Sequence, residues 1–383
     1  MQADLLRVTI VGAGIGGLTA AIALQRKGVR VQLIERVAEL KPVGAGITLQ
    51  SNAVQALDRI GLAESARQSG AVMQQVSIRL QNEQTITQID LKQLAAELGQ
   101  PNVCIHRGLL QQLLIDALED TELRTGVEVE SWEEHHDSIS LQLTDGTEHR
   151  CDALIGADGL RSKTRARLWG DVPLRSAGYT SWRGICPNRG LVPNGHAVES
   201  WGSGQRFGYL PVDSTCVYWF ATDATSNESI SKEVDKNRLI SRFIQWHQPI
   251  AKILGRTNSA DIVGTDILDL HPFRPWGRGP VTLLGDAAHA MTPNLGQGGG
   301  QAIEDAVTLA TWLESAENVD HWLRSYERRR YHRTRQFVNR SRLLGYIAQG
   351  NSGLLRSVRN GLFRWMPASI NHAQMRRMLT FNS

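Results

Sequence analysis

The chain has little cysteine, no long apolar run and no array of aromatic residues among its arginines, and each shortage excludes a class of protein. The four cysteines lie 30 or more residues apart and form no CxxC pair, which excludes a disulfide framework and a structural zinc site. No stretch of about 18 uncharged apolar residues is free of a glycine cluster, so we expect no membrane-spanning helix. The opening letters MQADLLRVTIVGAGIGG lack the basic region and cleavage site of a secretory signal. We therefore expect a cytoplasmic protein.

The charge of the chain is unevenly distributed. Residues 324–383 contain thirteen arginines, no lysine and the single acid Glu327, so this tail carries a net charge of +12 and the remainder carries −8. Such a tail either contacts an anionic partner, for example a membrane surface, or pairs with the acidic body of the protein. Because few aromatic residues stand among these arginines, we do not expect nucleic acid as a partner.

Hydrophobic periodicity predicts an α/β protein with two kinds of sheet, and the length of 383 residues favours two domains. The segment LRVTIVGAGIGGLTAAIALQRKGVRVQLIER reads as strand, glycine turn, helix and strand, whereas residues 179–222 alternate with period two. The predicted buried strand GPVTLLGD and the helix after it show the strand-and-helix pattern of the first segment again, so the chain returns to the first domain. We predict a Rossmann-like domain, an inserted and mostly antiparallel β-sheet domain, and a C-terminal helical segment.

A glycine fingerprint, Gly12-x-Gly14-x-x-Gly17, stands between the first predicted strand (6–11) and the first predicted helix (15–27). Glycines there permit a tight turn and a close approach of the backbone to a pyrophosphate at the helix N-terminus. The acid Glu35 closes the next strand 18 residues after Gly17 and suits a ribose diol. Both FAD and NAD fit this first crevice.

The segment GDAAHAMTPNLGQGGGQAIEDA at residues 285–306 favours FAD. Asp286 ends a late buried strand and suits the hydroxyls of a ribityl chain, and a glycine-rich loop then leads into a helix N-terminus near Gly298–Gly300. Backbone amides and a helix dipole suit the carbonyl edge of an isoalloxazine, which gains negative charge on reduction. We therefore expect the adenine end of a flavin at residues 12–35 and its redox end at residues 286–300.

Three motifs in this order, GAGIGG with Glu35-Arg36, GADGLRSKTR and GDAAHAMTPNLGQG, resemble those of the group A FAD-dependent aromatic monooxygenases, which have the para-hydroxybenzoate hydroxylase fold. The resemblance spans essentially the whole chain. It implies a FAD-binding domain at 1–74, 97–175 and 262–330, a substrate domain at 75–96 and 176–261, and the helical segment at 331–383. It also implies that FAD contacts Gly12, Ala13, Gly14, Ile15, Gly16, Gly17, Glu35, Arg36, Gly46, Arg107, Val129, Asp158, Asp286, Pro293, Gly296, Gln297, Gly298 and Gly299.

The resemblance also implies individual roles within this set. Arg107 belongs to the phosphate–ribityl region and Val129 to the adenine. Asp158 lies in a motif with Ser162 and Arg165 that binds both FAD and NAD(P)H. Since the chain has one dinucleotide fingerprint, we expect NADH or NADPH as a transient co-substrate, with no preference readable.

The function that the resemblance implies is insertion of one oxygen atom of O2 into an aromatic or heteroaromatic substrate through a flavin C4a-hydroperoxide. Shorter stretches look like bacterial alkylquinolone 3-hydroxylases, urate hydroxylases and relatives of zeaxanthin epoxidase. In the urate hydroxylases an arginine and a tyrosine twelve apart on adjacent strands address the substrate, and Arg206 and Tyr218 have this spacing. The alternative is a surface role for Arg206 and a core role for Tyr218.

Other functions are open at this point. An epoxidase of an isoprenoid or carotenoid alkene, a flavin-dependent isoprenoid reductase and a non-catalytic lipid- or prenyl-binding protein have related folds, although the intact GQGGG loop disfavours the last. The adjacent His135 and His136 point to opposite faces of a strand, so we expect no metal site. Asp286 and His289 lack a GxSxG nucleophile, which argues against acyl transfer. A monomer and a homodimer both fit.

Overall fold

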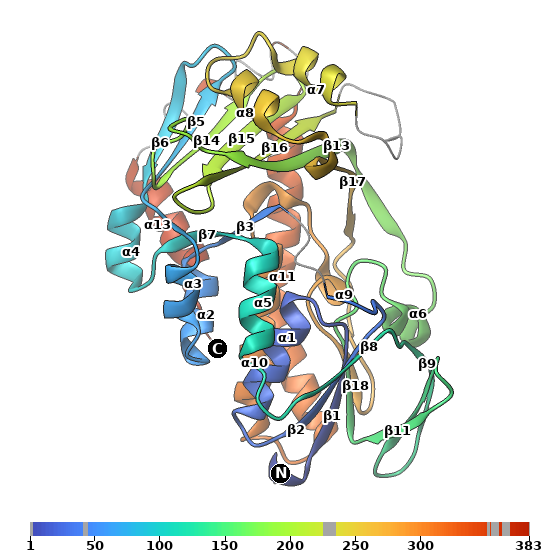
Figure 1. Cartoon of the computed structure of the whole chain (residues 1–383). Coiled ribbons are helices and arrows are strands. Elements are labelled where there is room, and N and C mark those ends of the chain that lie inside the picture. Colours follow the sequence, from blue (N-terminus) through green and yellow to red (C-terminus); the bar gives the residue numbers. More distant parts are fainter. Residues whose placement is uncertain are drawn as a thin grey trace.

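The computed structural model describes residues 3–40, 45–224, 235–350, 353, 360–361 and 368–382. A parallel sheet of five strands forms the centre of the lower part of the molecule in Figure 1. Its order is β18-β12-β1-β2-β8, and its strands are β1 (Arg7–Val11), β2 (Arg30–Glu35), β8 (Glu122–Thr125), β12 (Ala153–Gly156) and β18 (Val281–Leu283).

A seven-stranded sheet lies at the top of Figure 1, where helices α7 and α8 cover its outer face. Its only parallel pairing among the described strands is β14 with β5. In spatial order the strands are β17 (Val263–Leu270), β13 (Leu174–Pro187), β16 (Cys216–Asp223), β15 (Gln205–Pro211), β14 (His196–Trp201), β5 (Gln75–Leu80) and β6 (Thr85–Asp90).

The remaining strands form two small sheets of three strands each. The first small sheet holds β3 (Gly46–Leu49), β7 (Asn102–His106) and β4 (Ala71–Met73), and the second holds β11 (Glu148–Cys151), β10 (Ile139–Leu143) and β9 (Val129–Glu134). The helices are α1 (Ile15–Gln25), α2 (Ser51–Arg59), α3 (Ala63–Gln68), α4 (Leu91–Leu98), α5 (Arg107–Asp116), α6 (Lys163–Trp169), α7 (Lys236–Phe243), α8 (Ile250–Arg256), α9 (Asp286–His289), α10 (Gly298–Leu313), α11 (Val319–Ala348) and α13 (Ala368–Leu379), with 3-10 turns at Ala3–Leu5, Ser259–Asp261 and Pro293–Leu295.

The fold class predicted from the sequence is confirmed, because a parallel α/β part and a mostly antiparallel sheet are both present. The central strands β1 and β12 are mostly apolar and buried, as expected for strands that are covered on both faces, whereas the edge strand β8 is polar and partly exposed. Helix α1 is buried along most of its length and packs closely on α10, since a Cβ at Gly16 would lie 3.1 Å from that of Ala302. This contact brings the first glycine turn and the late glycine loop onto neighbouring helices.

The division into domains stays a prediction, but the pairing of the strands favours two changes to its boundaries. Strand β17 pairs with β13 in the seven-stranded sheet, whereas the predicted range 262–330 assigned it to the FAD-binding domain. Helix α11 runs without interruption through the boundary predicted at residue 331. We therefore propose that residues 263–270 belong to the substrate domain and that α11 belongs with the FAD-binding domain.

Some of the arginines of α11 pair with the rest of the protein. Arg333 bonds to Glu304 and Arg342 to Asp269, so the acidic body neutralises part of the basic tail. Residues 351–352, 354–359 and 362–367 of the predicted tail segment lie outside the described residues, and membrane contact stays a prediction. In the part of the chain that is described, none of the helices has the length and hydropathy needed to cross a bilayer.

A cluster of buried charges joins α10 to α11. The guanidinium of Arg330, which is 1% exposed, donates to Glu304 at 2.5 Å and to Asp305 at 2.6 Å. Burial alone raises the pKa of both carboxyls, but Arg330 and its neighbours Arg333 and His289 outweigh that effect and lower it. Both acids are therefore ionised in the core, and they depend on these cations.

We expect Arg330→Met to destabilise the fold by about 3–5 kcal/mol, because a buried ion pair that loses one partner leaves an uncompensated charge. Urea denaturation followed by circular dichroism measures the change. Arg328→Met, on an exposed face of the same helix, is the matched control and should stay within about 0.5 kcal/mol of the unchanged protein. Equal stability of the two variants would contradict the role assigned to this cluster.

Candidate flavin and substrate site

The glycine turn after β1 leaves an open space at the N-terminus of α1. A Cβ at Gly12, whose φ is +106°, would lie 2.5 Å from the carbonyl oxygen of Ala157, and a Cβ at Gly17 would lie 1.9 Å from that of Gly12. Beside Gly14, by contrast, no atom lies within 4 Å, and no side chain caps the helix. Free N–H groups and the positive end of the helix dipole thus face a space that suits a pyrophosphate.

Glu35 stabilises this turn and retains the capacity to accept further hydrogen bonds. Its two carboxylate oxygens accept hydrogen bonds from the N–H groups of Ala13 at 2.8 Å and Val37 at 3.0 Å. Since a carboxylate has about four acceptor sites, a ribose diol can still bind here. The N–H of Val127 donates to the carbonyl of Glu35, just before β9 begins at Val129. Val127 therefore borders this corner too, a residue that the sequence reasoning missed.

Asp286 provides a free carboxylate at the other end of the site. It is exposed and accepts no hydrogen bond from any residue that the structure describes, although surrounding protein raises its pKa, an effect that the charges of His289 and Arg107 oppose. A Cβ on Gly298 would lie 3.9 Å from its Oδ1. Arg107 and the start of α10 thus lie near Asp286, and their contact with a flavin stays a prediction.

The late glycine loop presents backbone rather than side chains. Gly296 has a φ of +62°, and α10 begins at Gly298 with no side-chain cap. A Cβ on Gly299 would lie 2.7 Å from Ile47 in β3, so the loop packs closely on that strand. The side chain of Gln297 is buried in an amide cluster with Gln50 and Asn52. Hence only the backbone amides around Gln297 suit a flavin ring.

The Asp158 motif contacts the segment that carries Asp286. The carboxylate of Asp158 accepts hydrogen bonds from the hydroxyls of Ser162 and Thr164 and from the N–H of Thr164. Arg165 donates to the carbonyl of Ala287 at 2.9 Å, next to Asp286. Since the carboxylate is already engaged within its own motif, these contacts favour a positioning role. Direct contact of Asp158 with a cofactor stays a prediction.

The register of the seven-stranded sheet separates its two faces. Arg206 pairs with Thr222, Gly208 with Phe220 and Leu210 with Tyr218, so these residues share one face. Residues Phe207, Tyr209 and Trp219 alternate with them and pack under α7 and α8 on the outer face. The first face, here called the inner face, contacts the FAD-binding part, because a Cβ on Gly46 would lie 2.6 Å from the ring of Tyr218.

Arg206 does not have the free guanidinium expected of a substrate ligand. It is 2% exposed, its Nε donates to Glu199 at 2.7 Å, and its Nη1 donates to Asn294 at 2.5 Å. Asn294 belongs to the late glycine loop and also accepts a hydrogen bond from the hydroxyl of Tyr179 at 3.0 Å. Arg206 therefore lies neither at a surface edge, as the alternative had it, nor free toward a substrate, as we expected. It connects the inner face to the loop.

Tyr218 differs from Arg206 in that its hydroxyl makes no hydrogen bond to any described residue. Burial raises the pKa of this phenol to about 12, with the charge of Arg183 opposing the shift. The hydroxyl is therefore protonated at neutral pH and acts as a hydrogen-bond donor, not as a base. Arg206 and Tyr218 are thus on one face, as their spacing suggested, but only Tyr218 is available to a ligand.

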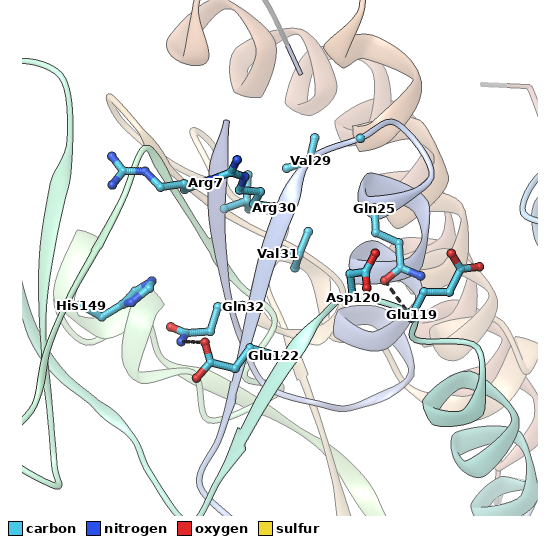
Figure 2. Close-up of a pocket in the computed structure, with 12 residues that line it drawn as sticks. Arg7, Gln25, Val29, Arg30, Val31, Gln32, Glu119, Asp120, Glu122 and His149 are labelled. Carbon is cyan, nitrogen blue, oxygen red and sulfur yellow. Dashed lines mark hydrogen bonds between the residues drawn. The ribbon is translucent and has the colours of Figure 1, made fainter. Parts of the chain in front are cut away.

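A hollow at the opposite edge of the parallel sheet is separate from this site. Figure 2 shows that Arg7, Arg30 and Glu122, from the first residues of three strands, line it. Ligands of open α/β sheets bind beyond the carboxyl ends of the strands, where Gly12 and Glu35 stand. We assign no ligand to this hollow.

The glycine turn, the free carboxylate of Asp286 and the late glycine loop together fit a flavoprotein that binds FAD. Comparison with known proteins agrees. The model of a family described as FAD binding domain matches residues 6–341. The chain therefore belongs to this FAD-binding family, and it is an FAD-dependent monooxygenase of the hydroxylase type.

Individual relatives cover nearly the whole chain. Aurachin C monooxygenase/isomerase of Stigmatella aurantiaca is 40% identical over 376 residues, or 98% of each chain. The 2-heptyl-3-hydroxy-4(1H)-quinolone synthase of Pseudomonas aeruginosa is 32% identical over 381 residues, again 98% of each. The crystal structure of Klebsiella pneumoniae HpxO with FAD and uric acid superposes with a TM-score of 0.90 at 28% identity, covering 98% of this chain and 96% of that one. The predicted family, enzyme class and FAD cofactor are confirmed, and the individual site residues stay predictions.

We expect Asp286→Ala to weaken FAD binding about 10- to 100-fold, because a hydrogen bond to a charged group is lost. Since the carboxylate holds no other described residue, the fold should be unchanged. Titration of the apoprotein with FAD, followed by flavin fluorescence, measures the dissociation constant. Asp137→Ala, at an exposed acid in a distant turn, is the control. An unaltered affinity in Asp286→Ala would remove this residue from the site.

Proposed function

We propose that the chain uses NADH or NADPH and O2 to hydroxylate a heteroaromatic ring of the 2-alkyl-4(1H)-quinolone type. Two relatives that match 98% of the chain support this substrate class. The name of one states a hydroxyl at carbon 3 of a heptylquinolone, and that of the other states a monooxygenase acting on aurachin C. The observation that carries the proposal is the inner face of the sheet, where a phenol free of described partners stands beside apolar side chains.

The residues of this face suit such a ring. Tyr218 can donate a hydrogen bond to a ring oxygen. Phe220 packs against Gly208, where a Cβ would lie 2.1 Å from the ring. Ile185 is the partner of Tyr218 in the neighbouring strand and adds an apolar contact. Together these side chains can orient a planar substrate and keep water from the reacting atoms.

FAD, when bound, supplies electron transfer from NAD(P)H and activation of dioxygen. Asp286 and Arg107 would hold its ribityl–phosphate part, and the first turn of α10 would direct N–H groups to the ring edge that gains negative charge. The chain's own task would then be to hold the substrate ring beside the bound flavin and to keep the loop in position through Arg206 and Asn294.

The first test supplies the purified holoenzyme with NADH or NADPH, 2-heptyl-4(1H)-quinolone and oxygen-18 gas. We expect substrate-dependent oxidation of the nicotinamide and one labelled oxygen in the product, measured by mass spectrometry. Uric acid, a salicylate-type acid and a carotenoid serve as comparison substrates. Label that enters from water, or turnover without oxygen, would contradict a monooxygenase reaction.

The second test concerns the free phenol. We expect Tyr218→Phe to lower kcat/KM for the accepted substrate about tenfold, because one neutral hydrogen bond is lost. Tyr209→Phe is the matched control on the outer face of the same sheet and should change kcat/KM less than about twofold. Equal values for the two variants would exclude a role of Tyr218 in the reaction.

A further inference from the structure

We propose that Arg183 is the residue that anchors an oxygen of the substrate ring, a role that the spacing of the sequence had suggested for Arg206. This inference rests on the proposed function, which places the substrate ring on the inner face of the seven-stranded sheet. It identifies the ligand by its chemistry: a planar ring with a carbonyl, enolate or carboxylate oxygen that carries partial or full negative charge.

The position of Arg183 follows from the register of the sheet. It pairs with Phe220 in β16, so its side chain leaves the sheet on the inner face, beside Tyr218. Its charge acts on the hydroxyls of both Tyr218 and Tyr179. Tyr179 in turn donates to Asn294 of the late glycine loop, so Arg183 lies on the face of the sheet that contacts this loop.

The guanidinium of Arg183 has no partner among the residues that the structure describes. It makes neither a hydrogen bond nor an ion pair there, although the residue is only partly exposed. Glu199, an acid on the same face of the sheet, is paired with Arg206. A partly buried guanidinium without a partner destabilises the fold, because part of its hydration is lost and not replaced. This favours a ligand whose oxygen accepts hydrogen bonds from it.

The chemistry of the two free groups defines what they bind. Arg183 offers a planar array of N–H donors that fits an oxygen with negative charge, and Tyr218 offers one O–H donor to the same oxygen. The guanidinium can only donate, and the phenol has one O–H to donate beside it, so together they favour an acceptor atom. A 4-quinolone carbonyl, a urate oxygen and a carboxylate meet this requirement, whereas an unsubstituted hydrocarbon or an alkene does not. The pair therefore disfavours a carotenoid as substrate.

The test measures binding to the oxidised holoenzyme through the perturbation of the flavin absorption spectrum. The probes are 2-heptyl-4(1H)-quinolone, 2-heptylquinoline, which lacks the ring oxygen, uric acid and 3-hydroxybenzoate. The proteins are the unchanged chain, Arg183→Met, Arg183→Lys and Arg79→Met. Arg79 is the matched control, because it lies in β5 of the same sheet, pairs with Ser200 on the outer side and acts on Tyr209 there.

We expect Arg183→Met to weaken binding of the oxygen-bearing probe about 10- to 100-fold, the range for a hydrogen bond to a charged group, and to leave 2-heptylquinoline unaffected. Arg183→Lys should lose less, since it keeps the charge without the planar fork. Arg79→Met should bind as the unchanged protein does. FAD content and thermal unfolding verify that each variant is folded.

The outcomes separate this inference from the proposed function. Equal affinity of Arg183→Met and the unchanged protein for every oxygen-bearing probe overturns the inference, even if labelled oxygen enters a quinolone product. Binding that depends on Arg183, without such a product, supports the inference and contradicts the proposed reaction. If the unchanged protein binds no oxygen-bearing probe more tightly than 2-heptylquinoline, the anchoring role is wrong.

Discussion

One buried carboxylate, that of Asp305, fixes the two segments that frame the flavin site. Its Oδ2 lies 3.0 Å from the amide nitrogen of Gly285 and 2.5 Å from Nε2 of His289, and its Oδ1 accepts from Arg330 at 2.6 Å. The turn that presents Asp286 is thereby tied to the body of α10, whose first residues lie next to Asp286. A buried carboxylate is stable only when its hydrogen-bond and ion-pair partners are all in place. The geometry of the site therefore depends on the packing of the core around Asp305.

A second hub, Asn294, joins the substrate sheet to the flavin loop. It accepts from Arg206 and Tyr179 of the sheet, and its amide nitrogen donates to the carbonyl of Ser341 in α11 at 2.9 Å. A Cβ at Gly345 of α11 would lie 2.3 Å from that nitrogen, so the glycine makes room for the side chain. The side-chain amide of Asn294 therefore holds the late glycine loop against the inner face of the sheet. A displacement of the loop has to break contacts to both the sheet and the long helix.

Local patterns predicted well those parts of the molecule that depend on local geometry. The turn at Gly12, the acid Glu35 at the end of β2 and the helix start at Gly298 follow from backbone sterics and from the order of strand, loop and helix. The family motifs placed Asp286 and Arg107 near one another, which the charges acting on Asp286 agree with. Boundaries that depend on distant pairing were harder. Strand β17 joins β13 almost ninety residues earlier in the chain, and its own sequence does not reveal that partner.

The fate of the two inner-face arginines shows why spacing alone is insufficient. A distance of twelve residues on adjacent strands establishes that Arg206 and Tyr218 can share a face, and they do. It does not reveal that the guanidinium of Arg206 donates to Glu199 on the neighbouring strand β14. Nor does it reveal the second hydrogen bond, to Asn294, which lies 88 residues later. Once Arg206 is neutralised, a cation for the substrate has to come from another strand. Arg183 fills that position because no described acid reaches it, and whether an arginine serves the fold or a ligand is decided by its neighbours in space.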